Sequence, residues 1–209
     1  MPGIVPHVKK AGGLMISDEV QTGFGKLGSH YWGSDWAGYK PDIITMAKHL
    51  GNGFPMGAVA ASKEVASSCE KMIGSTYGGN PIAMAAGREV LRVIEEEKMQ
   101  ERALTQGKQL KDGLRNIMAK HEVVGDIRGE GLLVGIEIVT DKESKKPDPD
   151  MFNAIHENCK DNGLLMGRGG RYEKSNCFRL QPPMCISAGD VEFALDVIDR
   201  SVRDAVKNN

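Results

Sequence analysis

Residues 14–48 read LMISDEVQTGFGKLGSHYWGSDWAGYKPDIITMAK, and the rest of the chain is interpreted outward from them. Two short apolar segments, Leu14–Ser17 and Ile43–Ala47, each predict a buried strand. The first leads into Asp18, and the second ends at Lys48. In an open α/β sheet, ligands bind outside the carboxyl ends of the strands. The pattern therefore predicts that an acid and a lysine meet at a ligand-binding edge.

This pair of residue types has a functional and an ordinary interpretation. A lysine can hold pyridoxal phosphate as a Schiff base, while an acid keeps the pyridinium nitrogen of that cofactor protonated. Acids and lysines at strand ends are more often solvated residues without a chemical role, and spacing alone does not separate the two interpretations. A metal site is not expected, because the histidines and cysteines are scattered without ligand spacing.

The composition is that of a folded protein with an ordinary core. Of the 209 residues, 40% are hydrophobic and 26% are charged, which argues against a disordered chain. The net charge of −1, without a basic stripe, argues against binding to nucleic acid or to an anionic membrane surface. No apolar run reaches the length of a membrane span, and the first residues resemble neither a signal peptide nor a transit peptide.

The later part of the chain predicts helices followed by a smaller α/β region. Asn80 followed by Pro81 is typical of a helix start. The composition shifts near Val123, so we expect residues 1–122 to form one domain with a long helical connection, and residues 123–209 to form a second, smaller domain.

Within the smaller region, the sequence predicts a turn-rich segment and several strands. Residues 124–131 contain three glycines and are expected to form turns, and residues 132–139 are expected to form a strand. Further strands are expected at Leu164–Met166 and Cys177–Leu180, and a last amphipathic helix follows Gly189.

Three longer segments resemble a known family. They are DEVQTGFGKLG at residues 18–28, PDIITMAKHLGNGFPMGAV at residues 41–59 and GSTYGGNP at residues 74–81. In this order they resemble the signature segments of class III pyridoxal-phosphate aminotransferases, nearest to the mitochondrial alanine–glyoxylate branch. The resemblance implies the C-terminal part of an α/β fold of fold-type I. That part is a partial large domain with a mostly parallel sheet, followed by a small C-terminal α/β domain.

The resemblance also implies roles for residues at matching positions. Lys48 is the implied Schiff-base lysine, which then moves a proton as general base and acid. Asp18 is the implied partner of the pyridinium nitrogen, and Gln21 is implied to lie near the ring oxygen. Ser75 and Thr76 match a segment that reaches the cofactor phosphate of the neighbouring subunit, which implies a homodimer. A plain loop that leads into a helix is the alternative for these two residues.

A further implied role concerns Arg179, which matches a residue that binds the substrate carboxylate through two hydrogen bonds. A structural ion pair is the alternative for this arginine. The family's glycine/serine phosphate loop and its ring-stacking aromatic residue precede the Asp18 segment in relatives and are not expected in this chain.

The implied reaction moves an amino group from an amino acid such as alanine to a keto acid such as glyoxylate. An ω-amino-acid transaminase, a phospho-lyase of the same family and a non-catalytic truncated product stay open as alternatives. The resemblance implies a mitochondrial location. Because no targeting segment is recognised in the sequence, a cytoplasmic location also stays open.

Overall fold

The computed structural model describes residues 3–71, 74–170 and 175–208. The chain divides into two compact units, Met1–Glu101 and Arg102–Asn209. This boundary lies near the start of α5 (Met99–Lys120), whereas the shift in composition had placed the domain boundary after residue 122, near the end of the same helix. Most of the long helix, from Arg102 to Lys120, therefore belongs to the second compact unit.

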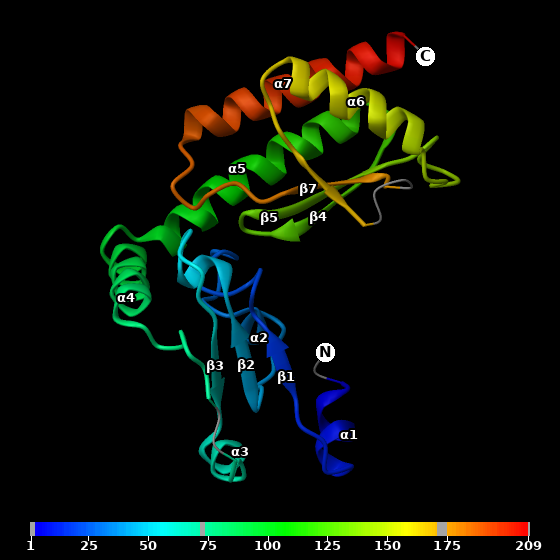
Figure 1. Cartoon of the computed structure of the whole chain (residues 1–209). Coiled ribbons are helices and arrows are strands. Elements are labelled where there is room, and N and C mark those ends of the chain that lie inside the picture. The colour runs from blue at the N-terminus through cyan, green and yellow to red at the C-terminus, as the bar shows by residue number, and fades with distance from the viewer. Residues whose placement is uncertain (1–2, 72–73, 171–174, 209) are drawn as a thin grey trace. The chain divides into compact units, whose positions relative to one another are not determined.

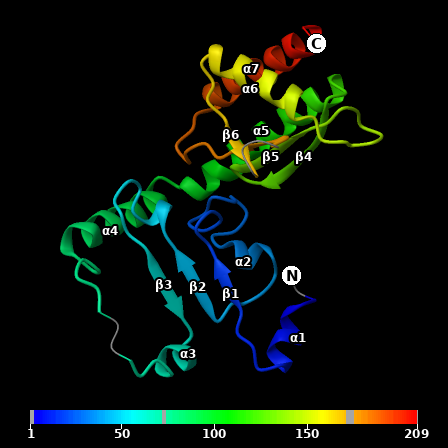
Figure 2. The ribbon, with the colours of Figure 1, turned by 45° about the vertical axis from the view of Figure 1, so that its right-hand side comes forward.

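The first unit contains a three-stranded sheet with the strand order β1–β2–β3. The strands are β1 (Ile16–Asp18), β2 (Ile43–Met46) and β3 (Ala58–Ala61). β1 and β2 run parallel, while β3 returns antiparallel to β2, and Figures 1 and 2 show the three side by side. The other elements are α1 (Val5–Lys10), α2 (Gly33–Trp36), the 3-10 helix η1 (Lys48–Leu50), α3 (Lys63–Ser67) and α4 (Pro81–Glu96).

The start of α4 is confirmed at the residues that predicted it. The side chain of Asn80 accepts a hydrogen bond from the backbone N–H of Ala83 at 3.0 Å, which satisfies one of the free donors of the first turn. Pro81 occupies the first helical position, where its missing N–H costs nothing.

The sheet of the first unit leaves apolar side chains uncovered. Ile16 in β1 is 58% exposed and Val59 in β3 is 69% exposed. Most of the exposed large hydrophobic side chains among the described residues belong to this unit. Its folded state therefore gains less from apolar burial than its composition would allow.

The second unit is a two-layer α/β structure. Its sheet has the order β4–β5–β7–β6, and every neighbouring pair is antiparallel. The strands are β4 (Val124–Glu130), β5 (Leu133–Ile138), β6 (Gly167–Gly169) and β7 (Cys177–Leu180). Helices α5, α6 (Pro149–Asp161) and α7 (Ala188–Lys207) cover one face of this sheet in both views (Figures 1 and 2).

The hydrophobic core of the second unit lies between the sheet and the helices. Val134, Ile136 and Ile138 alternate along β5 and point inward, as the two-residue period of a strand requires. Phe152 of α6 stacks on Phe178 of β7, with ring centroids 4.2 Å apart. Both rings are buried, so they join the helix layer to the sheet.

We expect a small, measurable loss of stability when this core loses one methyl group. Ile155 on α6 is fully buried, and Ile155→Val should lower the free energy of unfolding of the second unit by about 0.5–1.5 kcal/mol. Chemical denaturation followed by circular dichroism measures this change. Val206→Ala on α7, where the side chain is 45% exposed, is the control and should change stability by less than about 0.5 kcal/mol.

One turn prediction and one strand prediction for the second unit are wrong. Residues 124–131 were expected to form turns, but β4 pairs with β5 there. Each glycine is needed for a different reason. At Gly125 the side chain of Val139 packs close to the backbone, since a Cβ there would lie 2.7 Å from it. At Gly129 the backbone has a φ of 132°, which other residues rarely adopt. Residues Leu164–Met166 precede β6 and do not form it.

No helix in the described ranges of the chain is long and apolar enough to cross a membrane.

Candidate functional site

The acid and the lysine singled out in the sequence follow strands that pair in parallel. Asp18 is the last residue of β1, and its partner in the register is Thr45 of β2. Lys48 follows three residues later, as the first residue of η1. Because the carboxyl ends of parallel strands lie at the same edge of a sheet, the fold places both residues at one edge. Both side chains are exposed.

The backbone at Lys48 is in a conformation that non-glycine residues rarely adopt. Its φ is 46°, in the left-handed region. The turn after it is tight, since a Cβ at Gly51 would lie 2.1 Å from the carbonyl oxygen of Phe54. β3 follows this turn and pairs with β2 up to Met46, so the backbone is held in a sheet both before and after the turn. Unusual backbone conformations of this kind cluster at functional sites.

Asp18 is held mainly by its place in the strand. Its Oδ1 accepts a hydrogen bond from the backbone N–H of Val20 at 3.1 Å, which is a local turn contact. Gln21 follows in the same turn and is half-buried.

The sequence analysis missed Glu19, which is the most strongly bound side chain of this region. It is fully buried and accepts hydrogen bonds from Ser17, Thr22, Gly33 and Ser34. A signal was present: residues two apart on a strand share a face, so Ser17 and Glu19 together place two polar groups on the inner face of an apolar strand.

His49 lies next to Lys48 in η1 and has an unusual environment. Burial lowers the pKa of its imidazole, and the charges of Lys26 and Lys48 lower that pKa further. Its Nδ1 atom is buried and has no hydrogen-bond partner among the described residues. A neutral imidazole therefore sits beside the candidate lysine at neutral pH.

Ser75 and Thr76 lie in an exposed loop that leads to the N-terminus of α4. The Oγ of Ser75 accepts a hydrogen bond from the backbone N–H of Gly78 at 3.0 Å. A Cβ at Gly78 would come within 2.8 Å of that Oγ, so this turn needs glycine. Backbone N–H groups at the start of a helix suit a phosphate.

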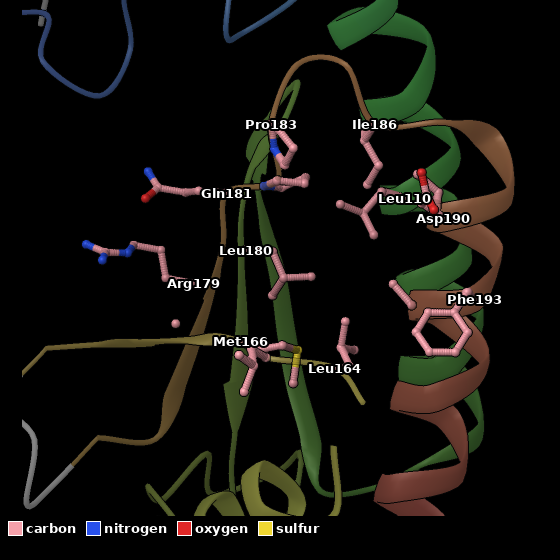
Figure 3. Close-up of a pocket in the computed structure, with 15 residues that line it drawn as sticks. Leu110, Leu164, Met166, Arg179, Leu180, Gln181, Pro183, Ile186, Asp190 and Phe193 are labelled. Carbon is pink, nitrogen blue, oxygen red and sulfur yellow. The ribbon is translucent and has the colours of Figure 1, made fainter. Parts of the chain in front are cut away.

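Arg179 lies on β7, within the second unit, beside a cavity of about 500 Å³. Figure 3 shows its guanidinium pointing away from the apolar side chains of the cavity, whereas Leu180 points among them. The alternation of the strand explains this, because Leu180 is buried and Arg179 is exposed. The guanidinium therefore lies on the outer side of the sheet, away from the apolar side chains of the cavity.

Comparison with known proteins identifies the family. The profile of the class III aminotransferases matches residues 2–202. The chain belongs to the class III aminotransferase family. The mitochondrial alanine–glyoxylate aminotransferase 2 of Homo sapiens is 49% identical over 193 residues, which is 91% of this chain and 37% of the human protein.

Solved structures confirm the fold class of this chain. A phospholyase from Arthrobacter, in complex with phosphoethanolamine, superimposes with a TM-score of 0.91 at 35% identity, over 97% of this chain and 48% of that one. An S-selective transaminase from Arthrobacter sp. superimposes with a TM-score of 0.89 at 34% identity, over 100% of this chain and 48% of that one. The chain thus shows fold-type I and spans about half the length of these structures, and 37% of the human relative.

The residues of this aminotransferase chain fit pyridoxal phosphate in their donor chemistry. Lys48 supplies an exposed amine and Asp18 an exposed carboxylate at the same sheet edge. The loop of Ser75 and Thr76 supplies hydroxyl groups near a helix N-terminus. Among the described residues no group of three or more His, Cys, Asp or Glu side chains could hold a metal ion.

Proposed function

We propose that this chain carries the central lysine and acid of a pyridoxal-phosphate-dependent aminotransferase. The proposed reaction moves an amino group from an amino acid such as alanine to a keto acid such as glyoxylate. One observation carries the proposal: Asp18 ends β1 and Lys48 follows β2, and because these strands pair in parallel, both residues stand at one edge of the sheet. The first compact unit would be the cofactor-binding part and the second the small domain.

Each residue has a distinct role in this proposal. When bound, the cofactor supplies an electron sink for the substrate's α-carbon. Lys48 would hold the cofactor covalently through Nζ, and its amine, when free, would move a proton to and from the reacting carbons. Asp18 keeps a proton on the ring nitrogen through its negative charge. Gln21, in the turn that follows, would contact the oxygen on the cofactor ring.

The phosphate of the cofactor would be bound by Ser75 and Thr76. Their loop offers two hydroxyl groups and leads to the N-terminus of α4, whose free N–H groups favour an anion. We propose that this loop serves the site of a second subunit, so that a homodimer shares its residues between two sites.

Arg179 would bind the carboxylate of the amino and keto acids. Arg179→Ala should raise KM for both substrates by about 10- to 100-fold, since a hydrogen bond to a charged group contributes about 1.5–3 kcal/mol. Absorbance of the bound cofactor should stay unchanged. The control is Arg102→Ala, which removes a guanidinium of the same unit that donates to the carbonyl oxygen of Cys185. Unchanged KM with a lost cofactor spectrum would show that Arg179 is structural.

A second candidate function is a phospho-lyase, which the structural match to the phospholyase with phosphoethanolamine favours. Phosphoethanolamine has no carboxylate and carries its phosphate on the carbon next to the one that bears the amine, whereas alanine carries a carboxylate on the amine-bearing carbon. Incubation with each compound in turn, followed by detection of released phosphate or of pyruvate, separates the two functions. The human relative is named mitochondrial, and we propose the same location for the protein to which this chain belongs.

The covalent role of Lys48 is tested by reduction and peptide mapping. The protein is incubated with pyridoxal phosphate, reduced with borohydride and digested, and the labelled peptide is sequenced. We expect the label on Lys48. A main label on another lysine, or no label above the level of a denatured control, would refute the proposal and would favour a non-catalytic product.

A further inference from the structure

The carboxylate of Glu19 is the centre of a buried hydrogen-bond cluster at the end of β1. Its Oε1 accepts from the Oγ of Ser17 at 2.9 Å and from the backbone N–H of Ser34 at 2.8 Å. Its Oε2 accepts from the Oγ1 of Thr22 and from the backbone N–H of Gly33 at 2.7 Å. The phenol of Tyr39 donates to Ser17 at 3.1 Å and extends the cluster.

The cluster joins three segments that are distant in the sequence. Gly33 and Ser34 are the first residues of α2, so the carboxylate also satisfies two free donors of a helix N-terminus. The approach is close: a Cβ at Gly33 would lie 2.7 Å from the side chain of Thr22 and 3.0 Å from Oε2 of Glu19. Only glycine fits at this position without a shift of the surrounding atoms.

The carboxylate remains charged despite its burial. Burial by itself raises the pKa of Glu19, but hydrogen bonds from Thr22, Ser34, Gly33 and Ser17 together bring that pKa below its ordinary value. Four donors aimed at one anion leave little freedom for its side chain to rotate.

The backbone of Glu19 is fixed as firmly as its side chain. Its N–H donates to the carbonyl oxygen of Thr45 on β2 at 3.0 Å, and its carbonyl accepts from the N–H of Gly23 at 3.0 Å. Neighbouring residues on a strand point to opposite faces. With Glu19 locked inward, Asp18 is held outward, although within the described ranges its own carboxylate accepts just the local hydrogen bond from Val20.

We infer that Glu19 is a positioning residue that fixes the direction of the Asp18 carboxylate at the sheet edge. This inference rests on the proposed function of Asp18. Glu19 itself is enclosed by protein donors and does not reach a ligand. Its contribution is to prevent the end of β1 from rotating, so that the charge of Asp18 has a constant position at the sheet edge where Lys48 also lies.

The amide of Val20 gives a direct measurement of this effect. Because its N–H donates to Asp18, its NMR chemical shift should follow the ionisation of that carboxylate as the pH changes. The variant Asp18→Asn removes the titration that belongs to Asp18 and so separates it from any titration caused by Glu19. The measurement uses the whole 209-residue chain and needs no cofactor.

We expect Glu19→Gln to reduce the amplitude of the Val20 titration by at least half. Each carboxylate oxygen of Glu19 accepts from a backbone N–H, so the NH₂ group of a glutamine side chain would face a donor instead of an acceptor at one of these positions. Thr22→Val, which removes one of the four donors, should give a smaller reduction in the same direction. The control is Leu50→Ala, a buried residue of the same unit whose side chain makes none of these hydrogen bonds. It should lower stability and leave the Val20 titration unchanged.

An unchanged Val20 titration in Glu19→Gln would overturn the inference and leave Glu19 a purely structural residue. If that variant does not fold, Thr22→Val decides in the same way. The proposed function has a separate test, which is the absorbance of added pyridoxal phosphate with the parent chain and with Asp18→Asn. Equal spectra there would count against the role of Asp18, while the Val20 measurement would still report whether Glu19 fixes that carboxylate.

Discussion

Replacing Lys48 with alanine should lower the rate of amino transfer by about 100- to 10,000-fold. A positioned general acid or base contributes a rate factor of this size, and the same residue also holds the cofactor covalently in the proposed function. The expected loss is in kcat, because the amine acts in the proton-transfer step and not in the first encounter with substrate. Steady-state and single-turnover kinetics of the complete enzyme that contains this segment measure the change.

The matched control for this variant is Lys63→Ala. Lys63 begins α3, is exposed and belongs to the same compact unit. It should leave kcat unchanged. A second comparison, Lys48→Arg, keeps the positive charge but has no amine that releases a proton near neutral pH. If either Lys48 variant turned over at more than a tenth of the parent rate, the assignment of Lys48 would be wrong.

Replacing Asp18 with asparagine should preserve most of the cofactor binding and remove most of the turnover. A carboxylate within hydrogen-bond distance shifts the pKa of a cationic partner by about 1–3 units. Without that charge, the protonated fraction of the ring nitrogen falls by about 10- to 1,000-fold near neutral pH, and the rate should fall with it. The pH dependence of the cofactor's absorbance measures the protonation, and kcat measures the consequence.

A suitable control for Asp18→Asn is Asp35→Asn, in the first turn of α2. Asp35 is an exposed carboxylate of the same unit and is not placed at the sheet edge. Its removal should change neither the spectrum nor the rate. Near-normal turnover by Asp18→Asn would reject the role proposed for this carboxylate.

The parts of the fold with local signals could be predicted from the sequence. The apolar runs before Asp18 and Lys48 became β1 and β2, and Asn80 with Pro81 became the start of α4. The expectation that both strands are buried was wrong, because Ser17 is the one buried residue of these two strands. These features depend on residues close together in the chain, and the family resemblance then identified the fold class that the solved structures confirm.

The features that the sequence analysis missed depend on distant residues. β4 was interpreted as turns because Gly125 and Gly129 are turn-forming residues in isolation, and only the facing Val139 and β5 explain why glycine is needed there. Glu19 was passed over although Ser17, two positions before it, gave a local signal, because part of its hydrogen-bond cluster comes from distant residues. Two of its four donors are the backbone N–H groups of Gly33 and Ser34, which lie fourteen and fifteen positions away in the sequence. No pattern of side chains predicts that these backbone groups bind Glu19.

The hydrophobic core cluster of the described residues lies entirely in the second unit, whereas Asp18 and Lys48 belong to the first. A ligand that binds only the folded state stabilises it by about 2.7 kcal/mol at a concentration one hundred times its Kd. The first unit has little apolar burial of its own, so its melting should respond strongly to a bound ligand while the melting of the second unit should not. A thermal-shift screen that resolves the two transitions would therefore find ligands of this chain without any assay of catalysis.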